Sequence, residues 1–447
     1  MPLAEFPIDK RSALLLDKEN MTKYSISPMS SLYELYLRPP RISTDSRRIE
    51  PDSVFFALRG ASFDGNRFAA DALEKGAAYA VVDDPSLPNT RPDKADRLIV
   101  VDDALQTLQA LAREHRRELG LPILAITGSN GKTTTKELVS RVLSEKYEVY
   151  ATRGNLNNHI GVPLTLLAMT RDVEFGIVEM GASACGEIAL LCSIAEPNYG
   201  IVTNIGRAHL EGFGGPEGVR RGKGELYDWL ARAGGRVFVP ANDPVLMSMA
   251  AERETLAAEC YPTTLADGVE HHLEGDYNRF NVAAAVAVGR YFGVDDERIR
   301  YAVGSYRPDN HRSQKIRTGQ NTLILDCYNA NPSSMQASLV NFRQEPLEGC
   351  TQKILILGDM LELGDWSDAE HRHIISLAAE IPDARILLIG PHFAKAYRSL
   401  ESRPADTTLY PSQEALAAEL RKHPVSQALI LVKGSHSIGL ERLADLL

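Results

Sequence analysis

The chain has 447 residues, enough for roughly two to four domains, and 44% of them are hydrophobic, as in an ordinary globular protein. Its formal net charge of -10 argues against a general binder of nucleic acid or membrane surfaces. No apolar run is long enough to span a bilayer, the first residues lack a signal-peptide pattern, and the 5 cysteines form no zinc-type pairs. We therefore expect reduced thiols and a cytosolic location.

The beginning of the chain divides into an extension and a first α/β domain. Residues 1–20 show no periodic pattern, and Met21 offers a second start, so we expect this extension to be dispensable. Residues 21–120 form the first expected domain. Its apolar runs and helical spacing predict strands at 54–58, 77–82 and 98–101 and helices at 68–75 and 104–119.

Two polar segments of this first domain are candidates for a binding site. Asp45-Ser46-Arg47-Arg48 and Arg59-Gly60 place arginines beside small polar residues, a combination that can grip a diphosphate. A solvated loop explains the same residues more simply, and the residues alone favour that interpretation.

The stretch from Ile123 to Glu137 predicts a phosphate-binding loop between a strand and a helix. The apolar run 123–126 is too short for a helix and indicates a buried strand, and apolar residues at helical spacing from Leu138 predict the helix. Gly128 and Gly131 allow a tight turn whose amides, with the helix dipole, favour an anion.

The residues that follow this turn extend the phosphate interpretation. Lys132 adds a positive charge for phosphate, and Thr133 a hydroxyl for magnesium. Ile126 stands where the strict motif has glycine, so the loop is a shortened variant. The alternative is a plain glycine turn with a surface lysine. We favour a nucleoside triphosphate site because strand, loop, Lys-Thr and helix occur in the required order.

Alternating strands and helices continue to about residue 308 and predict a mainly parallel sheet, whose ligands lie beyond the strand carboxyl ends. Glu179 is at one such end and is a natural magnesium ligand, while His209 follows the next strand end. Taken singly, the two are more often a satisfied loop acid and a packed histidine. Asn278 and Asn281 stand three residues apart, just before a predicted helix at 282–290. They can share a face at its start and pair with adenine, or simply cap that helix. Lys223 is predicted to be a surface residue.

Residues 309–447 predict a third α/β unit, with strands at 322–326, 353–357, 385–389 and 428–432. Polar segments follow three of these strands, at 326–335, 358–364 and 433–436. Their position at one sheet edge predicts a cleft shared with the central domain. The expected fold class is α/β with an N-terminal domain at 21–120, a central P-loop-type domain at 121–308 and a Rossmann-like C-terminal domain at 309–447.

From about Thr44 to its end the chain resembles the Mur ligases of bacterial cell-wall synthesis. The segments that carry the likeness are Thr127–Thr135, Asn155–Pro163, Ala208–Gly214, Tyr328–Met335, Leu357–Gly364 and Lys433–Ser435. Within the family, Asn329-Ala330-Asn331-Pro332 is similar to the branch that adds D-alanyl-D-alanine to a UDP-N-acetylmuramoyl tripeptide.

The resemblance implies a role for each matched position. It implies ATP binding by Gly128, Ser129, Asn130, Gly131, Lys132, Thr133, Thr134, Asn278, Asn281, Arg312 and Asp326. It implies catalytic roles for Lys132, Glu179, His209, Lys223, Arg312 and Asp326, and a magnesium site at Thr133, Glu179, His209 and Lys223, with a possible carbamate on Lys223. It implies substrate binding by Ser46, Arg47, Arg59, Asn157, Asn158, Asn329, Asn331, Asp359 and Glu362, with the N-terminal domain holding the uridine diphosphate end.

The reaction that the resemblance implies is an ATP-dependent amide ligation through an acyl phosphate. The expected partners are the UDP-N-acetylmuramoyl tripeptide and D-alanyl-D-alanine, with no nucleic acid and no membrane span, and the protein is expected to be a monomer. One alternative is a sister ligase that adds a single amino acid, which the Asn329-Ala330-Asn331 segment disfavours. Another is a P-loop ATPase switch, which three substrate-sized domains disfavour. The sequence leaves open whether the tripeptide ends in lysine or diaminopimelate.

Overall fold

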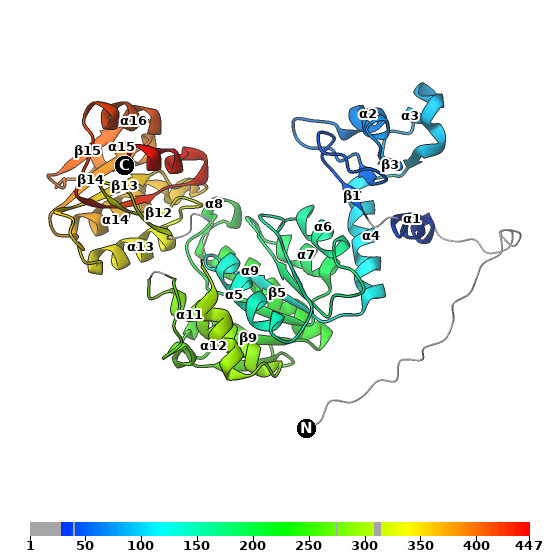
Figure 1. The fold of residues 1–447 in the computed structure, drawn as a ribbon, viewed down its shortest axis with the longest axis horizontal. Coiled ribbons are helices and arrows are strands. Elements are labelled where there is room, and N and C mark those ends of the chain that lie inside the picture. Colours follow the sequence, from blue (N-terminus) through cyan, green and yellow to red (C-terminus); the bar gives the residue numbers. More distant parts are fainter. Residues whose placement is uncertain (1–27, 39–40, 274, 308–313) are drawn as a thin grey trace, which may run out of the picture.

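The computed structural model describes residues 28–38, 41–273, 275–307 and 314–447. Figure 1 shows three α/β lobes in chain order, with the central lobe between the other two. Two sheets are parallel throughout and the third is mixed, which confirms the predicted fold class. The expected extension 1–20, the expected boundary at residue 308 and Arg312 lie outside the described residues.

The N-terminal lobe is built on a four-stranded parallel sheet in the order β1-β2-β3-β4. Strand β2 is shorter than the predicted 54–58, because the Leu58 N–H turns back to the Phe56 carbonyl at 3.0 Å. Helix α1 is not among the elements predicted from the sequence. The elements are α1 (Pro28–Tyr36), β1 (Ile42–Ser43), β2 (Val54–Phe56), η1 (Gly65–Phe68), α2 (Ala69–Glu74), β3 (Tyr79–Val82), α3 (Leu87–Thr90), η2 (Pro92–Arg97), β4 (Leu98–Val100) and α4 (Ala104–Leu119).

The central lobe has six parallel strands in the order β10-β9-β8-β5-β7-β6. Its middle strand is buried on both faces: Ile123 and Ala125 pack into one hydrophobic cluster, and Leu124 and Ile126 into another. Such two-sided burial explains the continuous apolar run. The elements are β5 (Ile123–Thr127), α5 (Lys132–Ser144), β6 (Val149–Ala151), α6 (Gly161–Leu167), β7 (Phe175–Glu179), α7 (Glu187–Ala195), β8 (Tyr199–Val202), α8 (Leu210–Phe213), α9 (Pro216–Ala233), β9 (Arg236–Pro240), α10 (Pro244–Ala251), β10 (Ala257–Tyr261), η3 (Thr263–Ala266), α11 (Asn278–Tyr291) and α12 (Asp296–Ser305).

The C-terminal lobe has a six-stranded sheet in the order β11-β12-β16-β13-β14-β15, in which only the β11–β12 pair is antiparallel. The four strands expected from the sequence are present within one residue at each end. The elements are β11 (Gln314–Arg317), β12 (Thr322–Asp326), α13 (Pro332–Gln344), β13 (Gln352–Gly358), η4 (Gly364–Trp366), α14 (Ser367–Ala379), β14 (Ala384–Ile389), α15 (Pro391–Arg398), β15 (Thr407–Tyr410), α16 (Gln413–Lys422), β16 (Ala428–Lys433), η5 (His436–Ile438) and η6 (Leu440–Leu446).

Among the described residues, each outer lobe packs against the central lobe. Leu210 and Phe213 of α8 belong to the hydrophobic cluster that also contains Met360 and Leu363 of the C-terminal lobe. At the other side, α4 packs against α6 and α7 of the central lobe. Among the described residues, no helix is both long and apolar enough to cross a membrane.

Candidate active site

The loop between β5 and α5, residues 128–131, is called the phosphate loop below. Its glycines are needed for close backbone approach. Gly128 and Gly131 have φ angles of 141° and 79°. A Cβ at Gly128 would lie 2.0 Å from Thr203 Oγ1, and one at Gly131 would lie 2.7 Å from Asn281 Oδ1. Helix α5 begins directly after this loop, at Lys132, so its unpaired amides face the loop.

Lys132 folds back over this loop. Its ammonium group donates hydrogen bonds to the carbonyls of Gly128 at 2.7 Å and Ser129 at 3.3 Å. A positive charge is therefore held where the loop amides already favour an anion, as the sequence predicts for a phosphate site.

Glu179 lies at the end of β7, next to Ile126 of β5 in the parallel pairing. Its side chain is buried, and the two carboxylate oxygens accept hydrogen bonds from Thr133 Oγ1 at 3.0 Å and Asn157 Nδ2 at 2.9 Å. A carboxylate beside a hydroxyl at a phosphate loop fits a hard divalent cation that takes its other ligands from phosphate and water. Within the described residues, no group of three or more His, Cys, Asp or Glu side chains is placed to hold a metal alone.

Lys223 is buried in α9, although physical reasoning from the sequence predicted a surface residue. It is 1% exposed, its Nζ donates to the Ala182 carbonyl at 3.1 Å, and it lies 5.0 Å from the centre of the Phe213 ring. Burial, and then the charge of Lys132, lowers the pKa of Lys223 to about 7. The glycine-rich basic segment around it suggested exposure, but α9 turns this side chain inward.

His209 joins the central lobe to the C-terminal lobe. Its backbone is left-handed, with φ 53°, and its Nδ1 contacts the Glu362 carboxylate, which also belongs to a left-handed residue, with φ 61°. Burial lowers the pKa of His209, and the Glu362 carboxylate opposes that shift. Two strained residues that contact each other across an interface indicate a position that the surrounding structure enforces.

Asn278 and Asn281 lie inside the first turn of α11, so they do not cap a helix that starts at residue 282. Both are buried, Asn281 Nδ2 donates to Asn278 Oδ1 at 2.8 Å, and Asn281 Oδ1 accepts from Thr135 Oγ1 at 3.0 Å. Both amides line the same cavity as the phosphate loop.

One cavity of about 930 Å³ collects most of these groups. The central lobe contributes the phosphate loop, Glu179 and His209, and the C-terminal lobe contributes Asp326, Asn329 and residues of α13. The predicted site residues that line it are Ser129, Asn130, Gly131, Lys132, Thr133, Thr134, Asn157, Asn158, Glu179, His209, Asn278, Asn281, Asp326 and Asn329. Lys433 also lines it and contacts the Asp326 carboxylate. Lys433 was not predicted as a site residue, although its place just after a strand was the available signal.

Five predicted residues in the described parts of the central and C-terminal lobes do not line this cavity. Gly128 and Lys223 line neither cavity, whereas Asn331 and Glu362 line a smaller cavity of about 250 Å³ beside His209. Asp359 is 1% exposed, and its carboxylate accepts the backbone N–H groups of His392 and Phe393 at the start of α15. In this structure Asp359 organises a helix start and does not reach either cavity.

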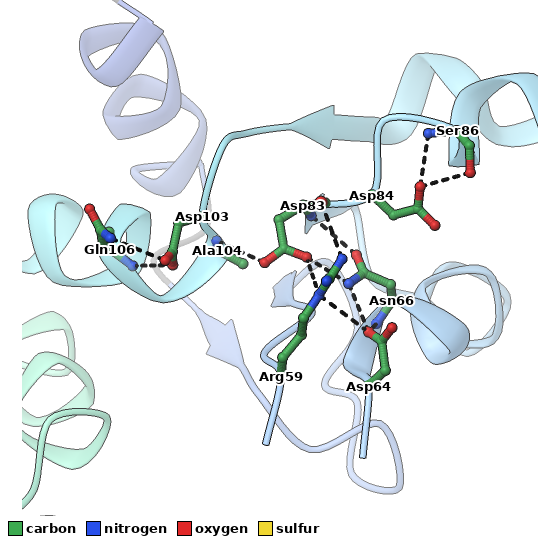
Figure 2. A network of polar contacts seen from close by, with 9 residues as sticks. All are labelled: Arg59, Asp64, Asn66, Asp83, Asp84, Ser86, Asp103, Ala104 and Gln106. Carbon is green, nitrogen blue, oxygen red and sulfur yellow. Dashed lines mark hydrogen bonds and ion pairs between the residues drawn. The ribbon is translucent and has the colours of Figure 1, made fainter. Parts of the chain in front are cut away.

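The predicted uridine-diphosphate residues lie in the N-terminal lobe, apart from the cavity. Arg47 forms two hydrogen bonds of 2.8 Å with Asp45. Figure 2 shows Arg59 in a network of polar contacts with Asp83 and Asp64, where its Nε donates to Asp83 Oδ1 at 2.8 Å. The Ser46 carbonyl accepts a hydrogen bond from Lys75 Nζ at 2.7 Å. The side chains of Arg47 and Arg59 are at least half exposed, so their guanidinium groups are partly available to a ligand.

The protein has three α/β lobes, and its phosphate loop faces a cavity that two of them share. This architecture is that of a multidomain nucleotide-binding enzyme. Family models match along the chain: "Mur ligase family, catalytic domain" at residues 41–116, "Mur ligase middle domain" at 126–264 and "Mur ligase, glutamate ligase domain" at 311–436. The protein belongs to the Mur ligase family.

Named relatives and solved structures are similar along nearly the whole chain. The UDP-N-acetylmuramoyl-tripeptide--D-alanyl-D-alanine ligases of Bacillus subtilis (strain 168) and Escherichia coli (strain K12) are 34% and 30% identical, each covering 90% of this chain and 92% of its own. A crystal structure of MurF from Acinetobacter baumannii matches with a TM-score of 0.79 at 30% identity, over 91% of this chain and 93% of that one. A MurF ligase from Thermotoga maritima in complex with ADP matches with a TM-score of 0.77 at 25% identity, over 91% and 96%.

Proposed function

We propose that this protein is an ATP-dependent ligase that joins D-alanyl-D-alanine to a UDP-N-acetylmuramoyl tripeptide. The observation that carries the proposal is the shared cavity, in which the phosphate loop of one lobe faces Asp326 and Asn329 of another. A nucleotide, an acid and an amine can meet there between two lobes. The relatives from Bacillus subtilis and Escherichia coli are named as ligases of these two substrates.

The reaction needs ATP because a carboxylate is a poor acylating group at neutral pH. Transfer of the γ-phosphoryl group forms a bond between phosphorus and the carboxylate oxygen of the tripeptide and releases ADP. The amine of the dipeptide then attacks the carbonyl carbon, the new C–N bond forms, the amine loses a proton and phosphate leaves. Catalysis of the first step depends mainly on position and electrostatics.

The residues of the central lobe supply that electrostatic environment. The loop amides and Lys132 would neutralise the β- and γ-phosphates, with phosphate oxygens replacing the Gly128 and Ser129 carbonyls that Lys132 now contacts. Thr133 and Glu179 would hold magnesium, which when bound neutralises charge on the phosphates. Asn278 and Asn281 would face adenine, and His209 would orient the cation site.

The N-terminal lobe would hold the uridine diphosphate end through Ser46, Arg47 and Arg59. The support is chemical: guanidinium groups bind phosphates bidentately, and Arg47 and Arg59 are 85% and 52% exposed while held near acidic partners. We also propose a monomer in the cytosol, testable by light scattering and by cell fractionation.

We further propose that Lys223 carries a carbamate. Carbon dioxide reacts with a neutral amine, and burial keeps a large share of the Lys223 amine neutral at neutral pH. The readout is a carbamate signal in the ¹³C NMR spectrum of protein equilibrated with ¹³C-bicarbonate. The signal should be missing in Lys223→Arg, and its persistence in that variant would assign it to another amine.

The deciding experiment measures ADP release and the mass of the product with each substrate omitted in turn. We expect repeated turnover, with continued ADP release and a product heavier by the dipeptide, only when tripeptide, dipeptide and ATP are all present. Running both the lysine and the diaminopimelate tripeptides shows which one is used. Continued ADP release when both peptides are absent would overturn the proposal. Product formation from a single amino acid in place of the dipeptide would also overturn it.

A further inference from the structure

The start of helix α13 is tied to the tip of the phosphate loop, although the two belong to different lobes. Asn331 caps α13: its Oδ1 accepts the Ser334 N–H at 2.9 Å, and Ser334 Oγ accepts the Asn331 N–H at 3.1 Å. With its other side-chain atom, Nδ2, Asn331 donates to Asn130 Oδ1 at 2.8 Å. We call this contact the Asn130–Asn331 tie.

A second contact beside the tie shows that this part of the interface is tightly docked. Ser333 Oγ accepts the Arg207 N–H at 2.8 Å. A Cβ at Gly206 would lie 2.9 Å from Ser333 Oγ and 3.3 Å from the Cβ of Ser129. Glycine is therefore needed at 206 for the two lobes to approach this closely.

Asn130 is a rigid attachment point. Its backbone N–H donates to Asn204 Oδ1 at 3.1 Å, and its carbonyl accepts from Asn204 Nδ2 at 2.9 Å and from Thr203 Oγ1. Because the loop tip is already fixed by its own lobe, the tie positions the C-terminal lobe relative to the loop rather than the reverse.

Helix α13, whose start the tie holds, contributes to the wall that the C-terminal lobe gives to the cavity. Ser338 of α13 donates to Asp326 Oδ2 at 2.8 Å, and both line the same cavity as the phosphate loop. Fixing the first turn of α13 therefore fixes the distance between Asp326 and the site where the phosphates would lie.

We propose that Asn331 is a positioning residue that sets the C-terminal wall of the nucleotide cavity through the Asn130–Asn331 tie. The family resemblance implied a substrate contact instead. The side chain is 5% exposed, and both its polar atoms already have partners within the protein. The proposal rests on the proposed function only in so far as the cavity binds an adenine nucleotide.

The test is a double-mutant cycle on ADP affinity, measured by calorimetry with no peptide substrate present. Asn331→Ser keeps an efficient N-cap but is too short to reach Asn130. We expect it to weaken ADP binding by about three- to tenfold, the loss of roughly one hydrogen bond. In the Asn130→Ala background the same change should have almost no further effect, because the tie is already gone.

Thermal melting controls for a damaged helix. Ser412→Ala removes the cap of α16, a helix of the same lobe outside this interface, and should lower the melting temperature. Asn331→Ser should melt like the wild type, because serine is a comparable cap.

The outcomes separate the tie from the substrate contact and from the proposed function. Additive losses in the cycle, or unchanged ADP affinity in Asn331→Ser with only a higher KM for the dipeptide, would overturn the tie. A wild type that binds ADP but forms no amide would overturn the proposed substrates, and the cycle would still decide on the tie. A wild type that does not bind ADP would overturn both.

Discussion

Lys132 shows how one residue depends on the local geometry of a loop. Its ammonium group contacts carbonyls of its own loop, which holds the positive charge beside the loop amides that favour an anion. Because this contact lies at the surface of the cavity and not in the core, its loss should affect chemistry much more than folding.

We predict that Lys132→Ala lowers the rate of amide formation by at least about 10²-fold, since a positioned charge is lost from phosphoryl transfer. The melting temperature should stay within a few degrees of the wild type. Lys146→Ala, which removes another lysine just beyond the end of α5, is the matched control and should retain activity. Near-normal turnover in Lys132→Ala would contradict the phosphate role.

His115 of α4 is a buried residue whose protonation should set a pH dependence of stability. Its Nε2–H donates to the Met169 carbonyl at 2.8 Å, and its Nδ1 accepts from the Tyr33 hydroxyl at 3.1 Å. Burial lowers the pKa of His115 below its ordinary value of 6.5, more than the Met169 carbonyl and Glu118 raise it. In the unfolded chain the imidazole regains its ordinary pKa, so below about pH 6.5 the unfolded state binds more protons than the folded state.

The stabilisation linked to neutral His115 should therefore be complete above about pH 6.5 and decline as the pH falls below it. We expect the melting temperature to drop by a few degrees between pH 7.5 and pH 5.5. His115→Gln keeps a donor and an acceptor but does not titrate, so its drop should be smaller. Equal drops in both proteins would show that other groups, such as buried His371, cause the dependence.

At the scale of elements, the nucleotide face of the central lobe depends on close packing between α5 and α11. Gly289 allows it: a Cβ there would lie 2.4 Å from Val142 of α5 and 2.9 Å from Ile299 of α12. Any side chain at 289 would push α11 away from α5, and α11 carries the two asparagines of the cavity.

We predict that Gly289→Ala destabilises the protein by about 1–3 kcal/mol, because overpacking outweighs the gain in helix propensity. Gly304→Ala is the matched control. Among the described residues, a Cβ at this helical glycine of α12 would meet the Glu270 carbonyl alone, at 3.4 Å, so this change should be neutral or slightly stabilising. Chemical denaturation of both variants checks the pair, and equal effects would show that the α5–α11 contact can relax.

At the scale of the whole molecule, function depends on how the C-terminal lobe sits on the central lobe. Beside the apolar contact of α8 and the Asn130–Asn331 tie, Arg207 reaches both carboxylate oxygens of Glu370 at 3.0 Å. Arg207 is 52% exposed and Glu370 is 8% exposed, so solvent screens this pair and its net contribution should be no more than about 1 kcal/mol.

We predict that Glu370→Ala raises hydrogen-exchange rates in α14 and around residues 206–213 by up to about fivefold, the equivalent of 1 kcal/mol. The charge-reversed double variant Arg207→Glu with Glu370→Arg should restore most of the protection, because it restores the attraction. Exchange that is unchanged in Glu370→Ala would show that apolar packing alone holds the lobes together.

The domain division expected from the sequence also belongs to this scale. The boundary near residue 120 remains a proposal: α4 ends there, yet its Arg116 donates to the Ala195 carbonyl at 3.0 Å and to Asn198 Oδ1 at 2.9 Å in the central lobe. Limited proteolysis that releases a fragment ending near residue 120 would support it.

Features that depend on neighbours in the chain could be predicted from the sequence. The strands, the phosphate loop with Gly128 and Gly131, and Glu179 at a strand end follow from patterns of a few residues, since backbone geometry and runs of buried residues are local. The other features depend on long-range packing. Asn331 meets Asn130 across 201 positions, and Lys223 is buried because Phe213 and Ala182 lie over it. Contacts at such separations depend on how the lobes pack, which no short pattern of residues encodes.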